Sequence, residues 1–233
     1  MKLTANRWAN YCRLRREITT VSFLRLRVAC GIPYTRYDFE RCEGGCMSVR
    51  EGILAILTLG PAYGLQLHSE LASRAPHRKP VNVGQIYGTL ERLSKQGLIE
   101  PAGTTDDALP LYRLTAGGRE ESGTWMRRPT VDALPEWTEM LDQVLITSSI
   151  DAHAAKSVAE DYRRWWEGDL ARTRTPMIDG SVTTEAHLAR VAREAQAVAA
   201  IAWLGSAIAA LSDYDSSRAL SDVRPKRGRK ARV

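Results

Sequence analysis

The segment from Met47 to Gly118 restricts most strongly what this chain of 233 residues can fold into. In three successive stretches, separated by glycine or proline, apolar residues recur at the spacing of an amphipathic helix. The stretches are about 48–59, the part around Leu67 and Leu71, and 83–96. Two short apolar runs, near 98–99 and 111–114, then flank a turn-rich tip, which predicts a β-hairpin. Three short helices followed by a hairpin predict a winged helix-turn-helix, with the hairpin as its wing.

Three motifs in this segment resemble the PadR family of bacterial transcription regulators. They are ILAILTLGPAYGLQL at the first helix and turn, GQIYGTLERLSKQGLIE at the third helix, and YRLTAGG after the hairpin. The resemblance implies a DNA-binding regulator that dimerises through C-terminal helices and that often responds to phenolic or aromatic compounds. Two features depart from the family: Gly88 follows Tyr87 where proline is common, and a segment like residues 1–46 is rare.

The third predicted helix has the features of a helix that reads DNA sequence. Asn82 is a suitable N-cap residue, and an apolar stripe along the helix should face the core. In the major groove, Gln85 would pair with adenine and Thr89 would contact a thymine methyl group. The alternative is an ordinary solvated helix face. The full set of candidate DNA-contacting residues is Tyr63, Lys79, Asn82, Gln85, Tyr87, Gly88, Thr89, Arg92 and Arg113.

The remaining candidates are expected to position the domain on the DNA backbone rather than to specify bases. Tyr87 and Arg92 suit phosphates, and Gly88 lets the helix backbone approach the DNA. Arg113, on the second strand of the wing, is expected near a minor-groove phosphate, although two aspartates at the tip of the wing would repel phosphates. Tyr63 either packs in the core or contacts a phosphate through its hydroxyl.

Beyond Gly118 the chain is predicted to be all-helical. Helices are expected at about 120–126, from Leu134-Pro135-Glu136 onward, at 152–173 and at 183–211. Apolar residues recur in the last helix at steps of three and four, at Leu188, Val191, Ala195, Val198 and Ala202. Such a long stripe suggests a partner helix from a second subunit, although an intramolecular bundle would give the same pattern. Residues 119–211 are therefore predicted to form a helical dimerisation and effector domain.

The net charge of +6 is unevenly distributed along the chain. Residues 1–46 hold nine basic and four acidic residues, 47–223 hold 18 and 23, and 224–233 hold six and none. An acidic body with basic ends is compatible with DNA binding without proving it. Residues 1–46 are expected to be a poorly ordered extension that the fold does not need. Residues 212–233 are expected to be a disordered basic tail that binds phosphates non-specifically.

Signatures of several other functions are missing from the sequence. The four cysteines, at positions 12, 30, 42 and 46, have no C-x-x-C spacing and no histidine nearby, so free thiols are expected rather than a metal site. There is no Gly-rich phosphate loop, no H-E-x-x-H and no G-x-S-x-G motif, so we expect no catalytic residues and no cofactor. No uninterrupted apolar run reaches the ~18 residues of a membrane helix, and no secretory signal is recognisable, which favours the cytoplasm.

Tryptophans at 125, 137, 165, 166 and 203 are numerous for a chain with two phenylalanines. They are expected to pack in the core and the dimer interface, with stacking on a planar aromatic effector as the alternative. Taken together, the sequence predicts a mainly α, homodimeric, cytoplasmic repressor that binds a double-stranded DNA operator and is released by a small effector. The alternative from another class is a protein-interaction module that uses the winged helix as a scaffold.

Overall fold

The computed structural model describes residues 47–129, 134–175 and 183–222. The chain divides into two units, Met1–Gly44 and Gly45–Val233, and all of the described residues belong to the second unit. The predicted N-terminal extension with its four cysteines and the basic run at 224–233 lie outside the described residues.

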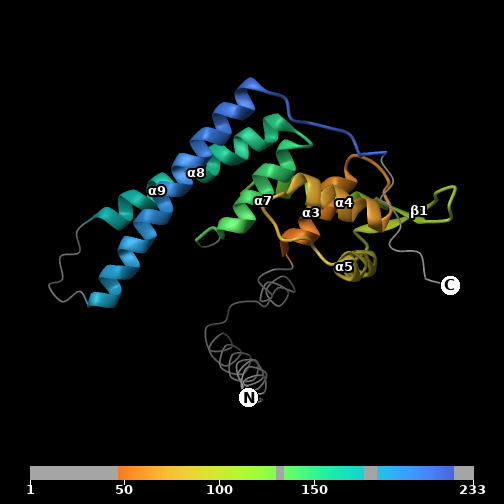
Figure 1. The fold of residues 1–233 in the computed structure, drawn as a ribbon, viewed down its shortest axis with the longest axis horizontal. Coiled ribbons are helices and arrows are strands. Elements are labelled where there is room, and N and C mark those ends of the chain that lie inside the picture. Colours follow the sequence, from red (N-terminus) through yellow and green to blue (C-terminus); the bar gives the residue numbers. More distant parts are fainter. Residues whose placement is uncertain (1–46, 130–133, 176–182, 223–233) are drawn as a thin grey trace, which may run out of the picture. The chain divides into compact units, whose positions relative to one another are not determined.

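The first part of the described chain is a winged helix-turn-helix, as the sequence predicts (Figure 1). Its elements are α3 (Met47–Leu57), α4 (Gly64–Arg74), α5 (Val83–Lys95), β1 (Ile99–Thr104) and β2 (Pro110–Leu114). The two strands are antiparallel, with Ile99 opposite Leu114 and an irregular register between Pro101 and Thr104. An isolated bridge between Ala62 and Tyr112 ties the turn after α3 to the hairpin.

Local sequence signals account for the ends of these elements. The side chain of Asn82 accepts a hydrogen bond of 2.8 Å from the Gly84 amide and so caps α5. Gly97, with a φ of 72°, supplies the left-handed residue after α5 that an L-residue adopts only at a cost. The Thr115 hydroxyl accepts a hydrogen bond from the Gly118 amide and caps the start of the next helix.

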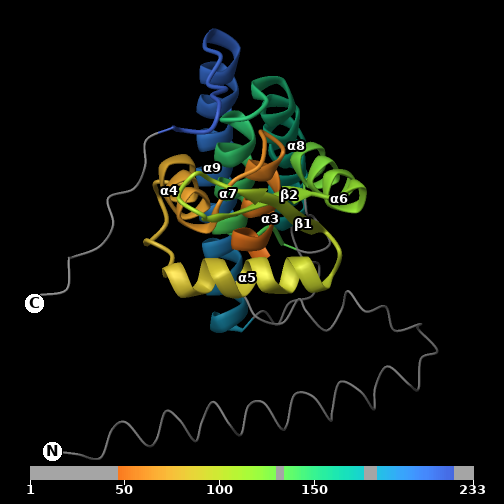
Figure 2. The same cartoon turned by 90° about the vertical axis from the view of Figure 1, so that its right-hand side faces the viewer.

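Four further helices follow, namely α6 (Ala116–Arg127), α7 (Trp137–Ser148), α8 (Ala152–Arg174) and α9 (Thr184–Asp213). The prediction that Pro135 lies in the first turn of α7 is wrong, because Glu136 is the extended N-cap residue and the helix begins at Trp137. Helices α8 and α9 lie side by side (Figures 1 and 2). Helix α7 is shared between two hydrophobic cores, since Ile146 packs into the winged-helix core and Met140 packs between α8 and α9.

Helix α9 carries apolar residues on all sides. It buries Ala197, Ala200 and Leu204 against the rest of the chain. The stripe that the sequence singles out lies on the other side of the helix, with Leu188 60% and Val198 48% exposed. By length and composition alone, α9 also passes as a helix that could cross a membrane, with a mean hydropathy of 1.6 over 18 residues of which 17% are buried.

Candidate nucleic-acid interface

Helix α5 presents one polar, solvent-exposed side and buries the other. Ile86, Leu90 and Leu93 are at most 1% exposed and pack into the winged-helix core, as predicted. Asn82 and Gln85, at the start of the helix, are exposed. This end of α5 therefore carries polar side chains that are accessible to a groove of DNA, the arrangement in which a helix contacts base edges.

Two glycines set the geometry around the first turns of α5. The ring of Tyr87, which is 41% exposed, lies against the start of α4, where a Cβ on Gly64 would come within 2.7 Å of Tyr87 Cε1. Gly64 thus allows α4 and α5 to approach closely. A Cβ on Gly88, in contrast, would meet no atom within 4 Å, so packing within the described chain does not require glycine there. An open backbone at this position suits close contact with an outside molecule.

The placement of Thr89 on the exposed side of α5 was wrong. Its side chain is buried, with 1% of the residue exposed, and its hydroxyl donates a 2.8 Å hydrogen bond to the Gln85 carbonyl oxygen. The same hydroxyl accepts a 3.2 Å bond from Arg92 Nη2. Thr89 therefore has no free methyl surface for a thymine base, and it acts instead by holding Arg92.

The other predicted residues lie in three places around α5. Lys79 is exposed in the loop before the helix, and Tyr63 is half-buried at the N-cap position of α4. Arg113 is exposed on β2, where its Nε lies 2.8 Å from Glu100 Oε1 on the opposite strand. The structure thus brings Tyr63, Tyr87 and the start of α5 together through the contact at Gly64, whereas Arg113 belongs to the separate surface of the wing.

A network of charged groups anchors the far end of α5 to its neighbours. Arg50 Nη1 lies 2.7 Å from Glu51 and 2.5 Å from Glu121, and Arg50 Nη2 donates a 3.2 Å bond to Gln96 Oε1. Burial raises the pKa of the Glu51 carboxyl to about 7, although Arg50 opposes that shift. This network joins α3, α6 and the residue that follows α5.

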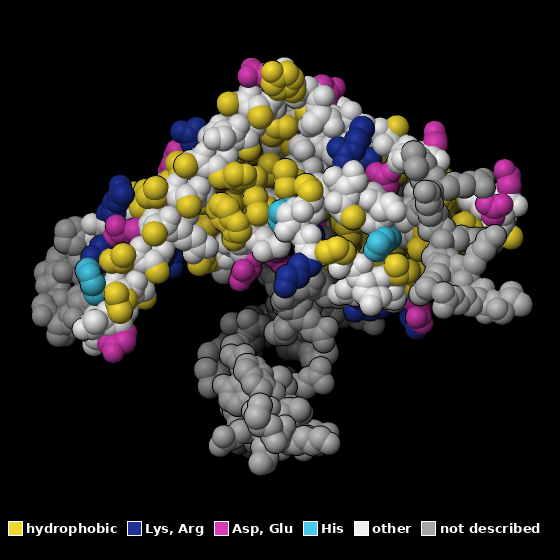
Figure 3. Space-filling model, viewed as in Figure 1, with side chains coloured by type: hydrophobic (Ala, Val, Ile, Leu, Met, Phe, Trp, Pro, Cys, Tyr) yellow, Lys and Arg dark blue, Asp and Glu magenta, His cyan; other side chains and the backbone are white. Residues whose placement is uncertain are grey.

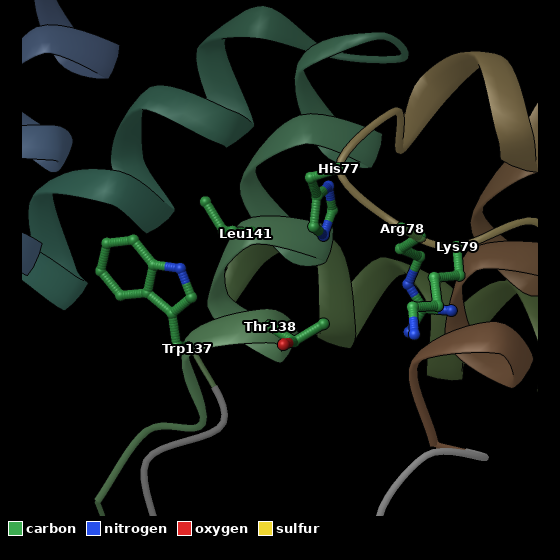
Figure 4. A pocket seen from close by; sticks show the side chains of 6 residues that line it. All are labelled: His77, Arg78, Lys79, Trp137, Thr138 and Leu141. Atoms are coloured by element: carbon green, nitrogen blue, oxygen red, sulfur yellow. The ribbon is translucent and has the colours of Figure 1, made fainter.

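A pocket of about 500 Å³ lies between the loop before α5 and the start of α7 (Figure 4). It is lined by His77, Arg78, Lys79, Trp137, Thr138 and Leu141. At its edge, the buried Asp142 accepts a 2.6 Å hydrogen bond from Arg78 Nε, and His77 Nε2 lies 3.1 Å from the same oxygen. The sequence analysis missed this pocket, because its two sides are far apart in the chain. In the described ranges, no group of three or more His, Cys, Asp or Glu side chains is placed to hold a metal ion.

Most tryptophans pack as the sequence analysis expects. Trp166 is fully buried between α8 and α9, and Trp137, Trp165 and Trp203 pack against the same core. The rings of Trp137 and Trp203 lie 5.9 Å apart between centroids. Trp137 is the one that also lines the pocket described above.

Comparison with known proteins finds a family match within the winged-helix segment. Residues 53–124 match the model of the transcriptional regulator PadR-like family. A search of curated proteins finds no match. The Bacillus subtilis PadR structure in complex with operator DNA is 22% identical and covers 70% of this chain and 98% of its own, with a TM-score of 0.32.

Two further solved structures give similar values. The Bacillus subtilis PadR structure with p-coumaric acid is 21% identical, covers 71% of this chain and 99% of its own, and has a TM-score of 0.31. The Vibrio cholerae virulence activator AphA is 18% identical, covers 71% of this chain and 98% of its own, and has a TM-score of 0.30.

Proposed function

We propose, from the match of residues 53–124 to the model of the PadR-like family, that this chain is a member of that family and a sequence-specific transcription regulator that binds a double-stranded DNA operator. The observation that carries the proposal is the exposed N-terminal end of α5. There Gln85 faces solvent and Gly88 leaves the backbone open, while the apolar side of the same helix is fully buried. A side-chain amide at this point of a groove-reading helix is suited to pair with adenine.

The proposed contacts divide into two classes. Gln85 reads a base, whereas Arg92, Lys79, Tyr87 and the Asn82 end of the helix position α5 on the phosphates. Tyr63 and Arg113 are proposed to contact the DNA backbone only at the edge of the site. Thr89 is left out of the contact set because its side chain is buried.

The regulator is proposed to act as a homodimer through α9. The exposed stripe contains Leu188, Val191 and Val198, which are 46–60% exposed, and Figure 3 shows hydrophobic side chains along this helix. A second copy of α9 would remove these side chains from water, which is favourable at roughly 25 cal/mol per Å² of apolar surface. A membrane is the weaker alternative, because α9 also carries Arg190 and Arg193 and pairs with α8 through an ion pair.

The pocket beside the start of α5 is proposed to hold the effector. Lys79 supplies positive charge on one side, beside the Arg78 that is paired with Asp142, and Trp137 and Leu141 supply an apolar wall on the other (Figure 4). A small aromatic anion fits this combination. Because the loop that holds Arg78 and Lys79 leads directly into Asn82 and α5, occupation of the pocket would change the position of the DNA-contacting helix. This link between the pocket and α5 supports a repressor that leaves its DNA site when the effector binds.

The test of this function is a selection of double-stranded DNA from a random pool by the full chain, followed by titration at two salt concentrations. A sequence-specific regulator should enrich one motif with two related half-sites about one helical turn apart, and should bind it at least ~1,000-fold more tightly than scrambled DNA at physiological salt. Enrichment of no motif would refute the proposal.

The second candidate is a protein-interaction module in which the winged helix binds another protein. It is kept because the winged-helix segment is nearly neutral, with seven basic and six acidic residues in 47–118. Under that alternative, DNA binding would show no sequence preference at any salt concentration. We propose a cytoplasmic location and no catalytic activity under both candidates.

A further inference from the structure

After α9, the described chain returns to the winged helix (Figure 1). We call residues 216–222 the strap. The Ser216 hydroxyl donates a 2.8 Å hydrogen bond to the Ser148 carbonyl oxygen, and the Arg218 amide donates a 3.0 Å bond to the Ser149 carbonyl oxygen. Both acceptors lie where α7 ends and α8 begins, so the first part of the strap is fixed to the helical half of the molecule.

Arg74, in the last turn of α4, joins three parts of the chain. The residue is 2% exposed, and its Nε donates a 2.8 Å bond to Glu70 Oε2 on the same helix. Its Nη1 donates to the carbonyl and hydroxyl oxygens of Ser149, both at 2.8 Å. Its Nη2 donates to the carbonyl oxygens of Arg218 and Ala219 at 3.2 and 3.0 Å. Because unpaired donors on a buried guanidinium are costly, these acceptors hold the strap, α4 and the start of α8 together.

The end of the strap lies further toward the start of α4. The Ser221 amide donates a 2.6 Å bond to Glu70 Oε1, and the Ser221 carbonyl oxygen accepts a 3.0 Å bond from Gln66 Nε2. Leu220 packs against the winged-helix core, close to Gly60 in the turn between α3 and α4. The strap therefore runs antiparallel to α4 and is bonded to it along two turns.

The strap itself buries little surface. Of its residues, Leu220 is half-buried and the others are exposed. The strap is therefore held mainly by hydrogen bonds to its backbone, together with one apolar contact. A segment of this kind opens locally at a much lower cost than a core helix does. The strap can thus leave α4 while both hydrophobic cores stay folded.

Docking of the strap gives the molecule a second joint. Among the described elements, α6 and α7 make the main packing between the winged helix and the pair α8 and α9. Helix α7 contributes Ile146 to one core and Met140 to the other. Two bodies that are joined at one place can rotate about that place, as in a hinge. The strap ties the end of α9 to α4 at another place and so opposes this rotation.

The position of α4 is passed on to the DNA-reading helix. A Cβ on Gly64 would lie 2.7 Å from Tyr87 Cε1, so α4 and α5 are in close contact and move together. In a dimer that forms through α9, the orientation of each α5 relative to α9 sets the distance between the two copies of α5. That distance must match the spacing of the two half-sites on the DNA.

We propose that the strap is a brace that fixes the winged helix relative to α9, and that it thereby determines which spacing between two DNA half-sites the dimer accepts. The inference rests on the proposed function as a DNA-binding homodimer. It goes beyond that function because it assigns the specificity for half-site spacing to a segment outside the DNA-reading helix.

The test uses the full chain and three duplexes built from the selected motif. The first keeps the selected spacing, the second has two base pairs inserted between the half-sites, and the third has a single half-site. Two added base pairs rotate one half-site by about 70° and shift it by about 7 Å. The native chain should bind the second duplex at least about 30-fold more weakly than the first, because a braced dimer cannot engage both half-sites there.

The strap variant combines Leu220→Ala with Ser221→Pro, which removes the packing side chain and the amide that binds Glu70. The two inserted base pairs should weaken its binding by at most about fivefold, because unbraced winged helices can rotate to reach the displaced half-site. Its affinity for the first duplex should fall by about three- to tenfold, because a flexible dimer is less preorganised.

Two controls separate spacing from other effects. On the single half-site, the strap variant and the native chain should have affinities within about twofold of each other, because only one α5 is then engaged. The variant Ser217→Ala alters the strap at an exposed hydroxyl that bonds to the neighbouring Asp215. It should keep the native discrimination between the first two duplexes.

Hydrogen exchange of the native chain measures docking of the strap without DNA. The amides of Arg218 and Ser221 donate to fixed acceptors, so they should exchange at least about tenfold more slowly than in an unfolded chain. They should still exchange faster than the buried amides of α4. In the strap variant, the Arg218 amide should lose its protection.

A folded strap variant that keeps the native discrimination between the first two duplexes would overturn the inference. Unprotected amides of Arg218 and Ser221 in the native chain would also overturn it, and this result does not depend on how the variant folds. So would an equal loss of affinity by the strap variant on all three duplexes, since the strap would then support the winged helix itself. Enrichment of no DNA motif by the native chain would refute the proposed function, which none of the other results does.

Discussion

At the scale of single residues, Glu51 is a carboxylate placed where a charge is unfavourable. Its side chain is 11% exposed, and its Oε2 has no hydrogen-bond partner among the described residues. Burial raises its pKa from 4.5 to about 7, against the opposing effect of Arg50. The neutral form is therefore favoured in the folded state relative to the unfolded chain.

We predict that Glu51→Gln reduces the fall in the free energy of unfolding that occurs as pH rises from about 4.5 to 7. In that window the folded protein binds more protons than the unfolded chain, so the free energy of unfolding decreases as pH rises, and the contribution is complete above pH 7. The ionisation of Glu51 contributes at most about 3 kcal/mol to this change in the free energy of unfolding. Urea unfolding at pH 5 and 8 measures it, with Glu91→Gln, an exposed carboxylate on α5, as the control. An identical pH dependence in native chain and Glu51→Gln would contradict the assignment.

At the scale of elements, one carboxylate joins α8 to α9. Asp169 is 1% exposed and accepts bonds of 2.8 and 2.6 Å from Arg193, with Arg172 at 3.2 Å. The bond from Arg193 is the main reason why the pKa of Asp169 is lowered, in spite of its burial. The charged form of Asp169 therefore stabilises the packing of the two helices.

We predict that Asp169→Asn costs about 1–3 kcal/mol at pH 7, because a charge-assisted pair becomes a weaker neutral one. Since the pKa is lowered on folding, this stabilisation is present above about pH 3.8 and is lost as pH falls through the folded value. Thermal unfolding of both proteins from pH 7 downward should show the difference shrinking toward low pH. A difference that stays constant with pH would contradict the ionic origin.

The exposed side of α9 gives a second prediction for the elements. Replacement of Leu188, Val191 and Val198 by Ser should weaken the dimer at least 100-fold, because burial of each side chain is worth about 1–2 kcal/mol. The melting temperature of the monomer should change little, since these residues lie opposite the buried Ala197, Ala200 and Leu204. Analytical ultracentrifugation measures this, with Ala189→Ser as the control. A triple variant that remains a tight dimer would show that the dimer interface does not lie on this side of α9.

The elements also show what the sequence can predict. The Asn82 cap and the hairpin were predicted because caps and turns depend on a few neighbouring residues. The burial of Thr89 was missed because a threonine on a helix gives no sign of the neighbours that cover it. The contacts of residues 216–222 with α4 and the pocket were missed because they join residues far apart in the chain. Arg74 bonds to Ala219 and Arg78 to Asp142, and no local pattern reports such pairs.

At the scale of the whole molecule, all of the described residues belong to one unit. The two hydrophobic cores share α7, so the winged helix and the helical half are packed as one body. Residues 216–222 add a second connection between the end of α9 and α4. The residues that make these contacts all lie after position 46.

We therefore predict that a chain beginning at Met47 keeps its melting temperature within about 2 °C and keeps its operator preference. The lost +5 charge should lower only non-specific affinity, and the loss should disappear at high salt. Thermal unfolding and DNA titration of the two chains at several salt concentrations measure both effects. A large fall in melting temperature, or a changed preference at high salt, would show that the segment belongs to the fold.

The central claim, that the exposed end of α5 reads a DNA sequence, is tested most directly by Gln85→Ala beside Arg92→Ala, each titrated on the selected site and on a scrambled duplex. Gln85→Ala should lose about 1–3 kcal/mol on the selected site and almost nothing on the scrambled one. Arg92→Ala should weaken both equally and reduce the salt slope by about 1, and the exposed Ser94→Ala should change neither. An equal loss on both duplexes for Gln85→Ala would contradict the claim.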